Sequence, residues 1–203
     1  HAAKGLAEDV RFYGQWMRSE AERRIGNSFP RVRVTKDMAA SRPDLKSLVG
    51  QELLITAWLW ARTVKSPNPA FSKVDVPLAS TFVFSTKAGR EAVVEPLVEA
   101  GGYSFKVRIG KTAFSEQAKM GTSAGKRSAF RCLMSGEPIT YEHIRSEGKA
   151  GRMGARLLAV VADGDRGRVY LDPLPEQEAV AKRATPQWVP DMPLPDNPRD
   201  FKT

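Results

Sequence analysis

The sequence predicts an α+β fold in which an amphipathic N-terminal helix and a short C-terminal helix flank an antiparallel β meander. Two patterns support this prediction. Apolar side chains recur at spacings of three and four residues over Leu6–Ile25, which is the period of a helix. From residue 51 the period changes to two, in short runs bounded by glycine-rich turns, as in antiparallel strands. The chain has 203 residues, 41% of them hydrophobic, so it can bury a substantial core.

The N-terminal helix is predicted to end at Gly26. Acidic residues near its start and arginines near its end suit the helix dipole. Tyr13 and Trp16 form an aromatic stripe, which we interpret as core packing or as a face that docks on a larger enzyme. A ligand-binding surface is the alternative. One helix face collects Val10, Tyr13, Trp16 or Met17, Ala21 and Ile25.

The longest predicted strand begins at Leu53. Both of its faces are apolar over most of its length, which is typical of a central strand covered on both sides. Trp58 and Trp60 project from the same face. We interpret them as packed side chains, and stacking on single-stranded bases is the alternative. The alternating residues are Ile55, Ala57, Leu59 and Ala61 on one face and Thr56, Trp58, Trp60 and Arg62 on the other.

Turn signals divide the remainder of the chain. Phe29-Pro30 and Ser41-Arg42-Pro43 interrupt any regular pattern after the first helix, which predicts a connector. The last nineteen residues contain five prolines and predict an extended arm. The predicted strands are 74–85, 91–98, 103–109, 157–162 and 168–171, with a final helix over 175–183. The predicted units are a helix over 1–26, a connector over 27–50, a β-rich domain over 51–173 and a helix with an arm over 174–203.

Positive charge is concentrated in one part of the chain. The net charge is +9, and the stretch from 103 to 156 contains eleven Lys or Arg against four Glu. The composition of residues 110–130 predicts a mobile basic loop. In the segment 148–156, three glycines alternate with basic side chains. These segments suit phosphate contacts, while a solvated loop and a tight turn are the alternatives. The candidate DNA-contacting residues are Lys111, Lys119, Lys126, Arg127, Lys149, Arg152 and Arg156.

Two short turns have the positions of zinc-ribbon knuckles. One follows the long strand, at Ser66 and Phe71, and the other holds the single cysteine, at Cys132 and Ser135. A zinc ribbon closes a tetrahedral site with two thiolates from each knuckle. Only Cys132 is a thiolate ligand here, so we expect a degenerate ribbon without metal.

Five segments resemble the middle of large, predicted adenine-specific DNA methyltransferases that carry an inserted zinc ribbon. The most specific is EGKAGRMGARLLAVVADGDRGRVYL over 147–171. The resemblance implies that the chain is a piece of a larger enzyme that transfers a methyl group from S-adenosylmethionine to DNA adenine, in restriction-modification or phage defence. In that family the four knuckle positions are usually cysteines. The other segments are 7–26, ITAWLWARTVKSPNPA over 55–70, EQEA over 176–179 with PQW over 186–188, and NPRDF over 197–201.

The sequence contains no complete catalytic motif. Asn68-Pro69-Ala70-Phe71 resembles the turn with which amino-methyltransferases hold a flipped base, but Ala70 replaces its second proline. No glycine-rich cofactor loop precedes it. A catalytic thiol at Cys132 would need a base, for which His143 is the candidate. We therefore expect no catalytic residue and no bound cofactor in this chain.

Two functions follow as hypotheses. The first is a non-catalytic insert that contacts DNA for the remainder of a parent methyltransferase. The alternative is a structural or protein-interaction module that docks on a catalytic domain or self-associates without binding DNA. No apolar run approaches the roughly 20 residues of a membrane helix, so no membrane contact is expected. One cysteine excludes an internal disulfide, and we expect a cytoplasmic location.

Overall fold

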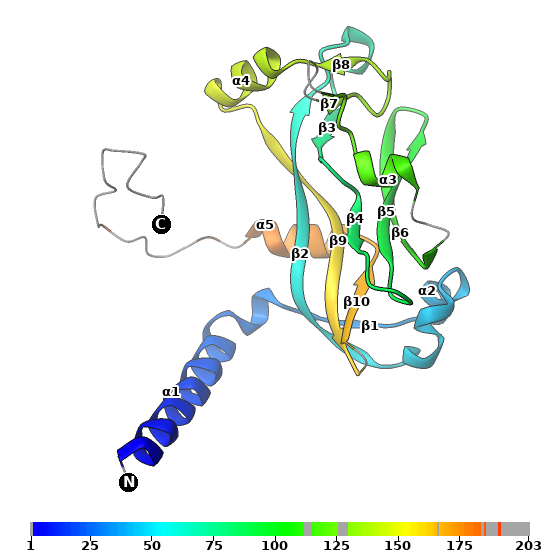
Figure 1. Ribbon diagram of the computed structural model, residues 1–203. Helices are drawn as coiled ribbons and strands as arrows, with labels where there is room; N and C mark the ends of the chain where they lie inside the picture. The colour runs from blue at the N-terminus through cyan, green and yellow to red at the C-terminus, as the bar shows by residue number, and fades with distance from the viewer. Residues whose placement is uncertain are drawn as a thin grey trace.

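The computed structural model describes residues 2–111, 115–125, 130–165, 167–183, 185 and 191, with side chains from residue 5 onward. It is an α+β fold (Figure 1). The helices are α1 (Ala2–Ile25), α2 (Lys36–Ala40), α3 (Glu116–Met120), α4 (Tyr141–Lys149) and α5 (Pro175–Arg183), with 3-10 turns η1 (Gly26–Ser28), η2 (Pro43–Leu48) and η3 (Pro69–Phe71). The strands are β1 (Arg31–Arg33), β2 (Glu52–Lys65), β3 (Asp75–Leu78), β4 (Val83–Ser85), β5 (Ala92–Glu99), β6 (Gly102–Ile109), β7 (Phe130–Arg131), β8 (Pro138–Ile139), β9 (Gly154–Gly164) and β10 (Gly167–Leu171).

The main sheet is built around β2 and β9, which run antiparallel along the length of the molecule (Figure 1). The strand order is β1-β2-β9-β10, and β3 also pairs with β2. The register runs from Leu54 opposite Asp163 to Thr63 opposite Gly154. A Cβ at position 154 would lie 2.7 Å from Oγ1 of Thr63, so a glycine is needed there. The predicted central strand is confirmed.

A second sheet, β4-β5-β6, packs against the main sheet and is the predicted antiparallel meander. The predicted strand over 74–85 is in fact two strands, because the chain leaves β3 and crosses to β4 at residues 79–82. Thr122 holds this crossing: its hydroxyl donates to the carbonyl of Pro77 over 2.8 Å and accepts from the amide of Ala79 over 3.0 Å. The core between the sheets contains Ala61, Leu158, Phe82, Val93, Val94 and Phe105.

The segment over 27–50, which we expected to be an irregular connector, contributes structure and core. It forms β1, α2 and η2, and Thr35 caps α2 by accepting a hydrogen bond from the amide of Met38 over 3.2 Å. Val34 and Leu45 are each 1% exposed and pack with Ile55 and Leu171. The prolines in this segment end its elements without preventing them, because the elements are short.

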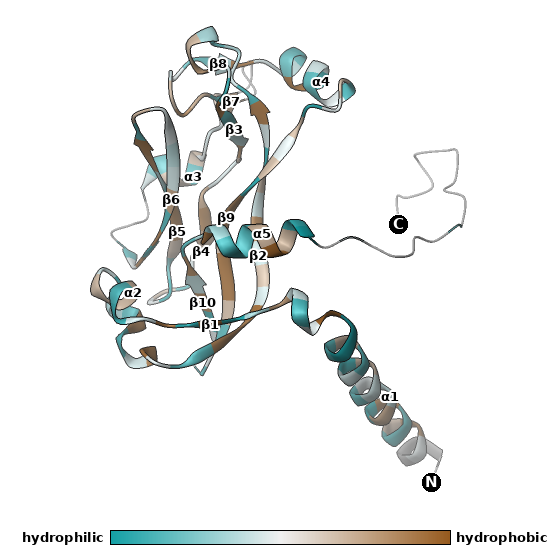
Figure 2. Cartoon of the chain, turned by 180° about the vertical axis from the view of Figure 1, so that it is seen from behind, coloured by the Kyte–Doolittle hydropathy of each residue, from teal (hydrophilic) through white to brown (hydrophobic). Residues whose placement is uncertain are grey.

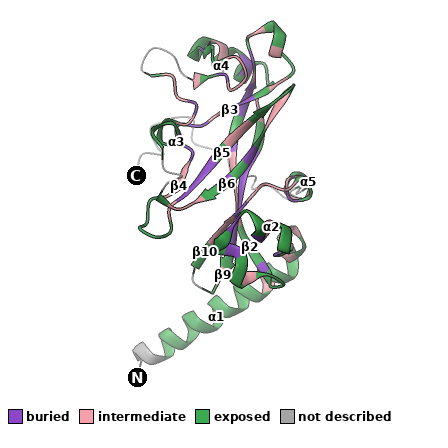
Figure 3. Ribbon diagram, turned by 90° about the vertical axis from the view of Figure 1, so that its right-hand side faces the viewer, coloured by how far each residue is buried: buried purple, intermediate pink, exposed green. Residues whose placement is uncertain are grey.

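The N-terminal helix exists as predicted, but its apolar side chains do not pack in a core of this chain. Figure 2 shows α1 standing clear of the sheets, and Figure 3 shows it exposed along its length. Tyr13 is 60% exposed and Trp16 57%. Trp58, by contrast, packs against Phe29 with 4.9 Å between ring centroids. Within the described residues, no helix combines the length and apolar character that crossing a membrane requires.

Phe82→Ala is expected to lower the free energy of unfolding by about 3–5 kcal/mol, because it leaves a cavity between the two sheets. Phe82 is 1% exposed. Urea unfolding followed by circular dichroism measures the loss. Phe12→Ala is the matched control, since Phe12 is 66% exposed on α1 and its removal should change stability by less than about 0.5 kcal/mol. Equal losses in the two variants would contradict this account of the core.

Candidate functional site

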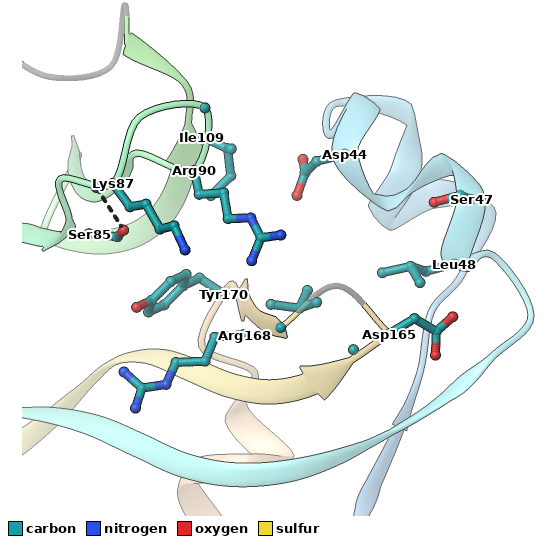
Figure 4. Close-up of a pocket in the computed structure, with 14 residues that line it drawn as sticks. Asp44, Ser47, Leu48, Ser85, Lys87, Arg90, Ile109, Asp165, Arg168 and Tyr170 are labelled. Carbon is teal, nitrogen blue, oxygen red and sulfur yellow. Dashed lines mark hydrogen bonds between the residues drawn. The ribbon is translucent and has the colours of Figure 1, made fainter.

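A hollow with a volume of about 680 Å³ lies between the tips of the two sheets (Figure 4). Four segments far apart in the sequence form its walls: η2, the β4–β5 turn, the end of β6, and the β9–β10 turn with β10. Such a volume lies within the usual range of ligand sites. The lining residues are Asp44, Ser47, Leu48, Ser85, Lys87, Gly89, Arg90, Ile109, Gly164, Asp165, Gly167, Arg168, Val169 and Tyr170.

The β4–β5 turn places two cations at this cavity. Within the turn, the backbone amide of Lys87 donates to the hydroxyl of Ser85 over 3.3 Å. The backbone amide of Arg90 donates to the carbonyl of Lys87 over 2.8 Å. Gly89, with φ of 72°, allows the chain to close this turn. In Figure 4 the side chains of Lys87 and Arg90 both project from the turn into the hollow. A tight turn therefore brings two positive charges together.

Arg90 reaches across the cavity to the β9–β10 turn. A Cβ at Gly167 would lie 2.9 Å from Nη1 of Arg90, so the guanidinium occupies the space over this glycine. Gly167 also has φ of 111°, a conformation that side-chain-bearing residues rarely adopt. A glycine at position 167 therefore allows both the backbone conformation of the turn and the close approach of Arg90.

Tyr170 forms the wall below the two cations. Its ring stacks on Phe84, with centroids 5.7 Å apart and planes 17° from parallel. Its carbonyl accepts a hydrogen bond from Arg42 over 2.9 Å, and Arg42 in turn holds Asp44 at 2.7 Å. Arg42 is only 7% exposed. This buried arginine neutralises Asp44 and ties η2 to β10, which keeps two walls of the cavity in place.

The charge that remains at the cavity is positive. Within the described residues, no carboxylate forms an ion pair with Lys87, Arg90 or Arg168. Arg168 extends from β10 away from the middle of the hollow (Figure 4). Because Asp44 is paired with Arg42, Asp165 is the lining carboxylate that opposes these three cations. The cavity is therefore suited to an anionic group.

Of the candidate DNA-contacting residues predicted from the sequence, those that the structure describes are spread over several elements. Those near α4 lie at the end of the molecule opposite the β9–β10 turn (Figure 1). Three of the others are engaged with carboxylates: Lys119 with Glu116 at 2.5 Å, Arg152 with Glu147 at 2.6 Å, and Arg156 with Glu178 at 4.0 Å. Lys111 follows the end of β6, and Lys149 ends α4; Lys126 and Arg127 lie outside the described residues.

The ion pair between Arg152 and Glu147 is structural. Glu147 is 7% exposed, and both guanidinium nitrogens that face it donate to its carboxylate, over 3.1 and 2.6 Å. The hydrogen bonds from Arg152 lower the pKa of Glu147 below its usual 4.5. Through these hydrogen bonds to Glu147, Arg152 stabilises the turn that follows α4. Arg156 is also engaged, since its guanidinium lies 5.8 Å from the ring centroid of Tyr103.

Sequence reasoning missed Lys87, Arg90 and Arg168. The predicted strands leave breaks at 86–90 and 163–167, but no local sequence pattern predicts that these two segments meet in space. The charge count also favoured 103–156, where several basic residues are balanced by nearby carboxylates in the folded chain.

The two predicted knuckles do come together. Oγ of Ser66 lies 3.4 Å from Sγ of Cys132, and the side-chain amide of Asn68 donates to Glu137 in the opposite turn over 2.9 Å. Burial raises the pKa of Cys132, but hydrogen bonds from Ser66, Ser135 and the backbone of the second turn outweigh it, so the net pKa is lowered. Cys132 is 2% exposed. Within the described part of the chain, no three His, Cys, Asp or Glu side chains are grouped to hold a metal.

Restoring the missing thiols is expected to create a metal site. The variant Ser66→Cys/Phe71→Cys/Ser135→Cys should bind one Co²⁺ with the visible absorption of a tetrahedral thiolate site, and Zn²⁺ should displace it. Absorption titration measures this binding. Adding Cys132→Ala to the same variant is the control and should weaken it. A four-thiol variant that binds metal no better than the natural chain would contradict a ribbon-like arrangement of the two turns.

No protein-family model, curated protein or solved structure matches this chain. The resemblance to adenine-specific DNA methyltransferases therefore remains a prediction from the sequence.

Proposed function

We propose that this chain is a non-catalytic module that contacts the phosphate backbone of DNA through the cavity between the β4–β5 and β9–β10 turns. The observation that carries the proposal is the set of three cations, Lys87, Arg90 and Arg168, which line one hollow without carboxylate partners in the described part of the chain. A cation that has no internal partner can pair with a phosphate without first breaking an ion pair.

The geometry suits the backbone better than the bases. The β4–β5 turn presents Lys87 and Arg90, and the start of β10 presents Arg168, so a phosphate can approach these cations from outside. Charge contacts of this kind fix the position of a protein on a duplex and carry no base sequence information directly. We expect affinity for DNA of any sequence, with strong dependence on salt.

The catalytic partner in this proposal is the remainder of a parent adenine-specific DNA methyltransferase. The resemblance of 147–171 and of the two knuckles supports it, as does the meeting of Ser66 with Cys132. S-adenosylmethionine would bind to that remainder. The role of the present chain would be to hold the duplex while the catalytic part acts on the base.

The triple variant Lys87→Ala/Arg90→Ala/Arg168→Ala is expected to weaken binding to a short duplex at low salt. It should also reduce the slope of log K against log salt by about 2 to 3, because each lost phosphate contact reduces the slope by about 0.9. Fluorescence anisotropy at several salt concentrations measures both quantities.

The matched control removes the same charge elsewhere. Lys65, Lys119 and Lys182 each contact a carboxylate, at 2.9, 2.5 and 2.6 Å, and their joint replacement by Ala should change the slope much less. Equal losses in both triple variants would show that net charge, and not the cavity, governs binding. Absence of duplex binding by the natural chain at low salt would overturn the proposed function.

A further inference from the structure

The cavity between the β4–β5 and β9–β10 turns is larger than a phosphate group requires. Its volume is about 680 Å³, which is in the range of pockets that bury most of a drug-sized ligand. A phosphate consists of a few atoms and fills a small part of this space. The remaining space is therefore available to the group that carries the phosphate.

Two opposite walls of the cavity differ in their chemistry. In Figure 4, Lys87 and Arg90 lie on the side of the β4–β5 turn. Asp44, Ser47 and Leu48 lie on the opposite side, on η2. Leu48 is partly buried against the hydrophobic core. One wall therefore presents cations, and the other presents a carboxylate, a hydroxyl and apolar surface.

The carboxylate of Asp44 is a group that a phosphate does not satisfy. Its two oxygens each accept a hydrogen bond from Arg42 over 2.7 Å, and each oxygen has a second lone pair for another donor. The side chain points from η2 toward the cavity (Figure 4). A phosphate oxygen is itself an acceptor, so the part of a ligand that lies beside η2 needs N–H or O–H donors.

We propose that the cavity binds one unpaired nucleotide, with its phosphate between Lys87 and Arg90 and its base on the η2 side. This inference rests on the proposed function, because it names the part of the DNA that enters the cavity. In a duplex the backbone oxygens are acceptors, and the N–H groups of the Watson–Crick edges are used in pairing. An unpaired base exposes these donors together with an apolar face, which suit Asp44 and Leu48.

Arg168 distinguishes a nucleotide within a strand from a free nucleotide. Its side chain extends from β10 away from the middle of the hollow (Figure 4), so it does not face the same phosphate as Lys87 and Arg90. The next phosphate of a strand is an anion that it can contact outside the cavity. A free nucleotide has the same chemistry inside the cavity but lacks this second phosphate.

Duplexes that differ only at one end test the proposal by fluorescence anisotropy. A duplex with one unpaired deoxyadenosine should bind about fivefold or more tightly than the same duplex with an abasic overhang, which has the same charge. Ser47→Phe should abolish this preference, because the added ring fills the η2 side of the cavity. It should leave the affinity for a blunt duplex unchanged, since the cations remain. Circular dichroism checks that the variant is folded.

The matched control places the same ring outside the cavity. Val49 directly follows η2, is 37% exposed and does not line the hollow, so Val49→Phe should keep the preference for the unpaired base. Arg168→Ala should weaken binding of the overhang duplex but leave competition by free deoxyadenosine monophosphate unchanged. Equal weakening of both ligands would overturn the assignment of Arg168 to a second phosphate of the strand.

The outcomes separate this inference from the proposed function. Equal affinity for the deoxyadenosine and abasic overhangs, or a preference that survives Ser47→Phe, would overturn the nucleotide site. Salt-dependent binding of the blunt duplex through the three cations would then still support the proposed function. Binding of free deoxyadenosine monophosphate without any binding of duplex would instead overturn the proposed function and support a nucleotide site for a small molecule.

Discussion

The pairing of β2 with β9 is the constraint on which the rest of the structure depends. These strands come from the two halves of the chain, and their ladder runs from Leu54 with Asp163 to Thr63 with Gly154. Their side chains supply both principal cores, Ile55 and Val160 at one end and Ala61 and Leu158 toward the second sheet. The other strands, the short helices and the two turn clusters are arranged around this pair.

The two ends of the ladder have different chemistry. At one end the hairpin turn of β9 and β10 meets the β4–β5 turn, and Arg90 lies over Gly167. At the other end β2 runs into the turn that begins at Ser66, which packs against Cys132. The first end is basic and open to an anionic partner, while the second is sealed by a buried thiol and the small hydrophobic cluster around it. The two turns are therefore held together by packing and hydrogen bonds around Cys132.

The cavity and the exposed apolar face of α1 lie in different parts of the chain. The cavity belongs to the packed β body, where the Arg42–Asp44 ion pair and the contact of Arg42 with Tyr170 keep its walls in place. The apolar face belongs to a helix that the body does not cover.

The sequence by itself determined the elements whose signals are local. The period of α1, the alternation in β2, the turn between β9 and β10 and the proline at the start of α5 each predicted an element that the structure contains. Tertiary structure decided what depends on distant contacts: β3 and β4 join different sheets, and residues 27–50 enter the core. It also decided which cations are paired, because Arg152 and Arg156 contact carboxylates, whereas Lys87 and Arg90 form no ion pair with a residue that the structure describes. Local patterns specify backbone conformation, but pairing between distant residues depends on how the whole chain packs.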